Sequence, residues 1–330
     1  MTRPGARPVF DPAGRDDALR TVLQDLRTGR WMAMRALLAD TTAWWQWTRR
    51  TQVLAAAAAG TDVVRAWLAE EPSSVPATVM HARVAVERAL RAHRDGHRRT
   101  HELWVEAWDA SDTAARAAPL DPVPWVCLIA LAPIDREQSW AEHRAPPPEP
   151  ALPPGPWGLL AEADKRDPHN REAHHRMLQF LCARSPSGRL TEAAAYAHRA
   201  AGSAPLGSAL HALPLYVRAE RYRRGAGRDA ALDLHWVAED ATREAGHALY
   251  AWFGHCPAAE RSPLDLNHLA HALWGAQRFP DAARVFAALG PYCTPAPWSY
   301  RTPDPNGAVE VFRHARARSM AATGGPGTGN

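Results

Sequence analysis

The segment REAHHRMLQFLC, residues 171–182, carries side chains whose types could do chemistry. His174 and His175 are adjacent and Cys182 follows seven residues later, and imidazole and thiolate groups are ligands that zinc prefers. On a helix that turns about 100° per residue, His174 falls on the apolar face, whereas His175 falls outside it, on the side of Cys182. Seven residues span about 10.5 Å of helix, but zinc ligands lie ~2.0–2.3 Å from the metal. We therefore expect His174 to pack inward, His175 to face outward, and no metal ion to bind within this segment alone.

A second group of candidate ligands lies near the C-terminus. It comprises Glu244, His247, His255, Cys256, His268 and His271. Glu244 and His247 form an ExxH, which is half of the motif that holds two iron ions in four-helix bundles, together with carboxylates from facing helices. His268 and His271 have a spacing that places both on one helix face, but no fourth ligand is assigned. We expect ordinary helix-surface histidines here, with no metal ion and no cofactor.

The stretch ERALRAHRDGHRRTH, residues 87–101, is strongly basic. His93, His97 and His101 would share one face of a continuous helix, but Gly96 is expected to break it. Two interpretations remain open. Either the arginines bind an anionic partner such as RNA or an acidic protein, or they form a solvated helix face.

Composition excludes several classes of protein. Lys165 is the only lysine among 39 basic side chains, an imbalance typical of a GC-rich coding bias, so the net charge of +4 is weak evidence for nucleic acid and we do not expect it as the partner. The longest apolar run, residues 53–59, is far shorter than the ~20 residues of a membrane span, and no signal-peptide core precedes the first helix. The four cysteines form no CxxC pair and suit a reducing compartment. We expect a cytoplasmic protein with no membrane partner.

Helical patterns dominate the chain, and motifs for nucleotide binding or nucleophilic catalysis are absent from it. Helices are predicted at 15–28, 31–39, 43–59, 61–70, 76–94, 98–118, 123–133, 135–143, 157–166, 170–184, 190–203, 207–223, 228–253, 263–276 and 280–289. The fourteen tryptophans are expected mainly to fill volume between alanine-rich helices.

The pattern divides the chain into two helical halves. Residues 1–13 and 319–330 are expected to be disordered. An N-terminal helical-repeat half is expected at 14–143 and a C-terminal half at 157–318. Between them, residues 144–156 contain seven prolines within 146–156, which predicts an extended loop. This loop is either a plain connector or a ligand for a proline-recognition protein.

Two local patterns recur along the helices. A tight turn with an arginine before an apolar residue enters a helix at 29–31, 188–193 and 277–282. Small or aromatic residues followed by a proline close a helix at Val64-Trp67-Pro72, Ala114-Ala117-Pro122, Leu160-Ala163-Pro168 and Ala197-Ala200-Pro205. These marks resemble the tetratricopeptide repeat, a helix–turn–helix unit of ~34 residues. Residues 267–290 resemble it most, with Leu269, Ala270, Leu273, Phe279, Ala282, Phe286 and Leu289 at the packing positions. Residues 157–205 are also similar to a group of uncharacterised helical proteins from GC-rich bacteria.

The resemblance implies an all-α fold, a right-handed α-solenoid of antiparallel helix pairs, with a concave groove. The implied groove positions are Glu172, His175, Gln179 and Cys182 in the middle of the chain and Asn267, His271 and Trp274 near its end. The leading hypothesis is therefore a non-enzymatic scaffold that binds a protein or peptide segment in this groove. The alternatives are a helical enzyme, metal-dependent in one version, that uses histidines from several helices, and anion or RNA binding through residues 88–99.

Overall fold

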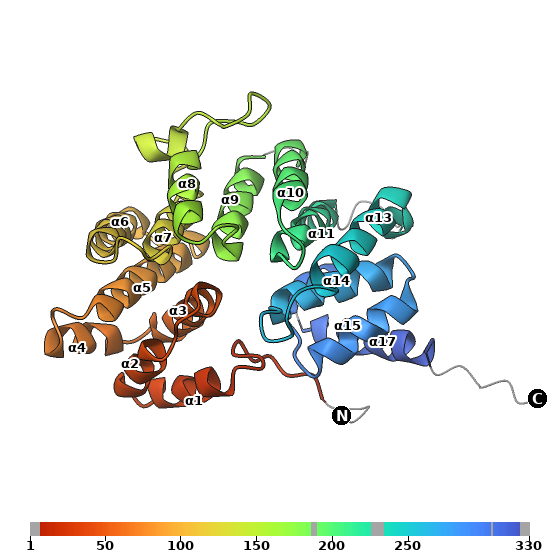
Figure 1. Ribbon diagram of the computed structural model, residues 1–330, viewed down its shortest axis with the longest axis horizontal. Coiled ribbons are helices and arrows are strands. Elements are labelled where there is room, and N and C mark those ends of the chain that lie inside the picture. The colour runs from red at the N-terminus through yellow and green to blue at the C-terminus, as the bar shows by residue number, and fades with distance from the viewer. Residues whose placement is uncertain (1–6, 186–189, 226–233, 305, 324–330) are drawn as a thin grey trace, which may run out of the picture. The chain divides into compact units, whose positions relative to one another are not determined.

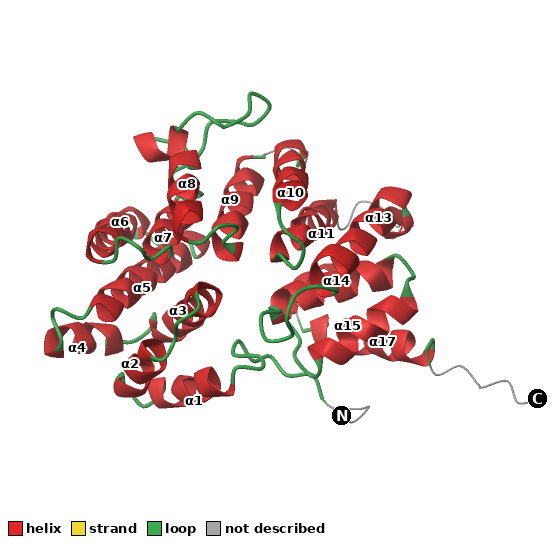
Figure 2. Cartoon of the chain, viewed as in Figure 1, coloured by secondary structure: helices red, strands yellow, loops and turns green. Residues whose placement is uncertain are grey.

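The computed structural model is all-helical, as predicted (Figure 2). It describes residues 7–185, 190–225, 234–304 and 306–323. Within these residues two isolated β-bridges occur, but no β-strand. None of the helices in this described part combines the length and the apolar character needed to cross a bilayer.

The chain forms two compact units, which we call the N-terminal unit (Arg15–Arg184) and the C-terminal unit (Met1–Gly14 with Ser185–Asn330). The N-terminal unit contains α1 (Asp17–Leu26), α2 (Met32–Ala39), α3 (Trp44–Ala58), α4 (Val63–Glu70), α5 (Val75–Arg94), α6 (Thr100–Ala117), α7 (Val123–Leu131), the 3-10 turn η1 (Ala141–Arg144), α8 (Trp157–Arg166) and α9 (Arg171–Arg184) (Figure 1). The longest pair, α5 and α6, pack against each other, and α7 packs on both.

The C-terminal unit is also built from short helices. In order they are α10 (Thr191–Ser203), the 3-10 turn η2 (Ala209–Ala212), α11 (Leu213–Gly225), α12 (Leu234–Val237), α13 (Glu239–His247), the π-helical turn η4 (Ala248–Phe253), α14 (Pro263–Gly275), α15 (Phe279–Leu289), α16 (Pro295–Trp298), η5 (Ser299–Arg301) and α17 (Ala308–Ala321). The segment with the strongest repeat resemblance forms the neighbouring helices α14 and α15. Large aromatic residues fill the core, and Trp236, Trp252, Trp298, Phe286 and Phe312 are all fully buried.

Side chains at the helix ends explain where several helices begin and stop. The carboxylate of Asp16 accepts a hydrogen bond from the Leu19 backbone N–H at the start of α1. Ser74 caps α5 in the same way. Gly96 adopts a positive φ of 61° directly after α5, which confirms that it breaks the basic helix.

The structure corrects the predicted domain boundaries. The units divide after Arg184 and not at the proline-rich loop, because α8 packs against α7, and α9 packs against α3, α7 and α8. The expected disorder at 1–13 is wrong for residues 7–13, since the Val9 backbone N–H donates to Pro291 O at 2.8 Å and Ala13 is fully buried. It is also wrong at 319–321, which belong to α17, where Ser319 is buried. Residues 1–6 and 324–330 lie outside the described residues.

Other predicted elements differ in detail. The helix expected at 135–143 is absent, and only the short turn η1 forms near its end. The helix expected at 228–253 is divided into α12, α13 and η4, and its residues 228–233 lie outside the described part, as do 188–189 of the predicted turn at 188–193. The helices α16 and α17 are additional to those predicted.

Candidate functional site

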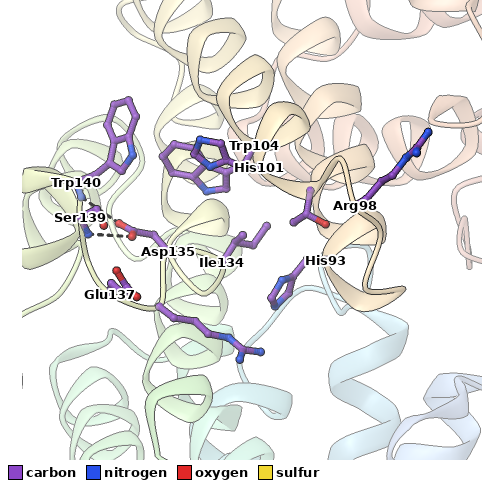
Figure 3. A pocket seen from close by; sticks show the side chains of 11 residues that line it. His93, Arg98, His101, Trp104, Ile134, Asp135, Glu137, Ser139 and Trp140 are labelled. Carbon is purple, nitrogen blue, oxygen red and sulfur yellow. Dashed lines mark hydrogen bonds between the residues drawn. The ribbon is translucent and has the colours of Figure 1, made fainter.

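A cavity of about 490 Å³ opens on the N-terminal unit, within the ~300–1,000 Å³ typical of ligand sites. Its walls come from the end of α5, the loop to α6, the first turns of α6 and the segment after α7. The lining residues are His93, Arg98, Thr100, His101, Trp104, Ile134, Asp135, Arg136, Glu137, Ser139 and Trp140. In Figure 3, Asp135, Ser139 and Trp140 lie together on one side, and Arg98 lies on the side away from Trp140. We call this cavity the α5–α6 pocket.

Asp135 organises the wall that follows α7. Its carboxylate accepts hydrogen bonds from the backbone N–H groups of Ser139 at 2.9 Å and Trp140 at 3.2 Å, and it lies 2.9 Å from Nδ1 of the fully buried His143. Burial alone would raise the pKa of Asp135, but the bonds from His143 and the backbone outweigh it and hold the pKa below its usual range. Because Asp135 binds these N–H groups and Gln138 adopts a φ of 51°, the segment forms a fixed loop in place of the predicted helix.

Stacked indole rings form the apolar wall of the pocket. Trp104 and Trp108 stack with centroids 5.4 Å apart, and Trp140 packs on both at 4.9 Å and 4.6 Å. The Trp104 Nε1–H donates to Leu131 O at 3.1 Å, which fixes its ring. His143 lies edge-on to Trp104 and Trp108. The wall is therefore preformed, and Trp140 is the half-buried member of it.

Two exposed arginines, Arg98 and Arg136, lie at the rim of the pocket. Within the described residues, the exposed guanidinium groups of Arg98 and Arg136 make no ion pair, and Glu137 is the one unpaired carboxylate of the lining. Burial, and next the charge of Arg136, lower the pKa of His93, which favours a neutral imidazole. The pocket therefore suits a ligand that carries negative charge beside a flat or apolar group.

The neighbouring arginines of the basic stretch are already engaged. Arg88 donates to the Ala59 carbonyl at 2.9 Å, Arg91 pairs with Glu87 at 3.0 Å, and Arg99 pairs with Glu102 at 2.7 Å. These three arginines of residues 88–99 are thus held by other groups, whereas Arg98 lines the pocket, as does His93.

The polar groups of the pocket do not assemble a hydrolytic triad. Ser139, Asp135 and His143 lie on one segment, but His143 Nε2 is buried and has no hydrogen-bond partner among the described residues. His143 therefore does not act as a base toward the Ser139 hydroxyl in the described part of the structure. The arrangement supports binding more directly than nucleophilic chemistry.

The groove residues predicted on α9 lie mainly inside the N-terminal unit. The Glu172 carboxylate is 3% exposed and receives bonds from Arg83 at 2.8 Å and 2.7 Å. The prediction that His175 faces outward is wrong, because α3, α7 and α8 all pack against α9 and leave this side chain 8% exposed. His174 is buried as predicted. Gln179 is exposed and accepts a bond from Arg176, and Cys182 is half-buried.

The groove residues predicted near the end of the chain are core groups of the C-terminal unit. Asn267 is fully buried, donates to Pro263 O at 2.7 Å and accepts from Trp298 Nε1 at 2.7 Å. His271 accepts a bond from Arg301 Nε at 2.9 Å, and burial, and next Arg301, lower its pKa well below the usual value. Trp274 is half-buried. The binding roles of these residues stay predictions, but Asn267 and His271 offer no exposed surface.

The candidate metal ligands are held by other partners. Glu244 pairs with Arg218 and His198, His247 contacts His211 at 3.1 Å, and burial raises the pKa of the Cys256 thiol to about 11. Glu172 and His175 have the same ExxH spacing as Glu244 and His247, and in both motifs the glutamate pairs with an arginine. Among the described residues, no group of three or more histidine, cysteine, aspartate or glutamate side chains could hold a metal ion.

Asp135, Arg136 and Trp140 were not among the site residues predicted from the sequence. The segment has the pattern of a helix but forms a loop. The sequence feature that indicates a loop is Asp135, two residues after Pro133 and four residues before Ser139, whose backbone N–H it binds. No protein-family model, curated protein or solved structure matches the chain.

Proposed function

We propose that this protein is a non-enzymatic helical interaction scaffold that binds an acidic segment of a partner protein in the α5–α6 pocket. The observation that carries the proposal is a preformed indole wall beside Arg98 and Arg136, two guanidinium groups without a carboxylate partner in the described structure. Aromatic and arginine side chains are the groups that most often anchor protein interfaces. We therefore propose this pocket as the binding site, in place of the groove residues predicted on α9 and α14.

The proposal includes the wider architecture. We infer that the helix pairs are tetratricopeptide-like units stacked in a right-handed α-solenoid, and that the protein acts in the cytoplasm. The repeat marks and the neighbouring helices α14 and α15 support the first inference. The free thiols support the second.

An acidic peptide fits the pocket better than RNA does. Asp135 and Glu137 line it together with the arginines. A phosphodiester chain carries a charge at every nucleotide and needs a continuous basic surface, which these carboxylates and the ion pairs of Arg91 and Arg99 interrupt. A peptide with one or two carboxylates and an aromatic residue needs only Arg98, Arg136 and the indole wall.

A peptide array tests the proposal. Fifteen-residue peptides that vary in acidic and aromatic content would be probed with the full chain, and an oligonucleotide of single-stranded RNA would be titrated in parallel. We expect retention of peptides that are both acidic and aromatic, and weaker binding of the RNA. Equal retention of acidic and neutral peptides, or tighter binding of the RNA, would overturn the proposal.

The aromatic wall gives a second readout. Trp140→Ala removes the half-buried ring. It is expected to lower the affinity for the best array peptide by about tenfold, because stacked aromatic contacts contribute ~0.5–1.5 kcal/mol beyond the area they bury. Trp44→Ala is the control, because Trp44 is an exposed tryptophan at the start of α3. Equal affinities of the two variants, measured by calorimetry, would place the peptide elsewhere.

A further inference from the structure

The proline-rich loop lies within one unit. It was predicted either to connect two helical halves or to serve as a ligand for a proline-recognition protein. The loop does not join the two units, because residues on both sides of it belong to the N-terminal unit. It connects η1 to α8 within that unit, and its seven prolines between residues 146 and 156 also make it a candidate ligand.

The base of the loop is tightly closed. Ala145 and Gly155 form a β-bridge in which the Gly155 N–H donates to Ala145 O at 3.0 Å. The Gln138 side-chain amide donates to His143 O and Pro154 O and so ties both ends of the loop. A Cβ at Gly155 would lie 2.8 Å from the Phe180 ring, so this position requires glycine. The base therefore holds the loop in one place.

Two further contacts anchor the second half of the loop, residues 152–156. Leu152 is buried, and the Trp157 Nε1–H donates to Pro153 O at 2.8 Å. A turn closed by the Leu152 N–H and Glu149 O, at 3.1 Å, reverses the chain. Residues 146–151 are left outside, all exposed except the half-buried Pro147.

The exposed part has the features of a polyproline ligand. Ala145 adopts φ −57° and ψ 145°, the polyproline II conformation, and Pro146, Pro147 and Pro148 follow it. Prolines have no N–H to donate, so their carbonyl groups and ring faces are what a partner meets. Because their φ angles are fixed, binding costs little conformational entropy.

Charge adds direction to this ligand. Arg144 precedes the prolines, its side chain is exposed, and within the described residues it makes no ion pair. Arg144 ends η1, the prolines 146–148 follow it directly, and Pro150 lies in the turn closed by Glu149 and Leu152. A groove that holds the prolines would therefore meet Arg144 at one end.

We propose that residues 144–151 are a docking surface for the aromatic-lined groove of a proline-recognition domain that carries an acidic side chain opposite Arg144. Tryptophan and tyrosine side chains of such a groove pack on proline rings and donate hydrogen bonds to the free carbonyl groups. This surface is separate from the α5–α6 pocket, since none of residues 144–151 lines that cavity. The chain thus presents a proline ligand and, independently, receives an acidic peptide.

The test uses the full chain and purified SH3, WW and EVH1 domains, each isotope-labelled and followed by nuclear magnetic resonance. We expect at least one domain to bind through its aromatic groove, and Pro147→Ala with Pro150→Ala to weaken that binding at least tenfold. Arg144→Glu should weaken it by a smaller factor. The control replaces Pro72 and Pro280 with alanine, two exposed prolines outside the loop.

Further measurements separate this proposal from folding effects and from the pocket. A synthetic peptide of residues 141–156 should bind the same groove more weakly than the full chain, because the closed base is lost. The Arg98→Ala/Arg136→Ala variant should bind the domain with wild-type affinity, whether or not the α5–α6 pocket binds an acidic peptide. Absence of groove shifts for every domain, or equal affinity of the Pro147→Ala/Pro150→Ala variant, would overturn the proposal.

Discussion

Each unit buries an arginine against acidic side chains, but the two sites differ in how far they are closed. In the N-terminal unit, Arg83 and Glu172 are 5% and 3% exposed and join α5 to α9 through two bonds. In the C-terminal unit, Arg218 is 4% exposed and pairs with Glu244 and Asp240, but the Asp240 side chain is 51% exposed. Both partners of the first site are buried, whereas the second site is open to solvent at Asp240.

The two sites should therefore differ in how their ion pairs respond to pH. Burial alone would raise the pKa of Glu172, but the charges of Arg83 and Arg176 outweigh it and keep the pKa low. In the open site His198 also binds Glu244, and both of its ring nitrogens face acceptors, Glu244 Oε1 at 3.0 Å and Ala194 O at 2.8 Å. The hydrogen bond to Glu244 raises the pKa of His198. The contribution of the N-terminal site to stability should therefore not change with pH near neutrality. The contribution of the C-terminal site should change, because His198 titrates there.

Breaking the closed site should have the largest effect. Arg83→Met leaves Glu172 as a buried charge with only Arg176 beside it, and removing one partner of a buried pair costs ~3–5 kcal/mol. Urea unfolding, followed by tryptophan fluorescence, should show this loss. Arg83→Met combined with Glu172→Met removes both charges and should recover much of it. If the free energy of unfolding of Arg83→Met lay within about 1 kcal/mol of the wild-type value, the Arg83–Glu172 pair would not be what joins α5 to α9.

Breaking the open site should cost less. In Arg218→Met the freed Asp240 can be hydrated, so we expect a loss of ~1–2 kcal/mol in the same assay, below the range for a fully buried pair. A loss as large as that of Arg83→Met would erase the distinction between the two sites.

The smallest effect should be the pH dependence of His198. Because its folded pKa is raised, the histidine stabilises the fold fully below its unfolded pKa of about 6.5, and this contribution is lost as pH rises through the folded value. His198→Gln should flatten the stability profile above about pH 6.5, with His255→Gln, another exposed histidine of this unit, as control. A ring titration by nuclear magnetic resonance at or below the ordinary value would contradict this assignment.

Local patterns predicted the helices well where each helix depends on its own residues. The helix predicted at 170–184 is α9 at Arg171–Arg184, and the one at 98–118 is α6 at Thr100–Ala117. The break at Gly96 and the loop at the prolines were also visible in the sequence. These features follow from backbone propensity and apolar periodicity, which act over a few residues.

The site was much less predictable, because it depends on contacts between elements. Helical phase places His175 outside the apolar face of its own helix, but it does not reveal that three helices surround α9. The loop around Asp135 reads as a helix until the carboxylate is seen to bind the Ser139 N–H and His143. Arg98 looks like its neighbours in the basic stretch, and only the ion pairs of those neighbours single it out.

We propose that Arg98 and Arg136 recognise negative charge in the α5–α6 pocket, and reversing both charges is the decisive experiment. The best acidic peptide of the array and a counterpart with lysine at every acidic position would be titrated into the wild type, Arg98→Glu/Arg136→Glu and the control Arg27→Glu/Arg30→Glu, which reverses two exposed arginines of α1's C-terminal side. We expect the wild type and the control to bind the acidic peptide at least tenfold more tightly than the lysine peptide, and the pocket variant to prefer the lysine peptide. An unchanged preference in the folded pocket variant would contradict the proposal.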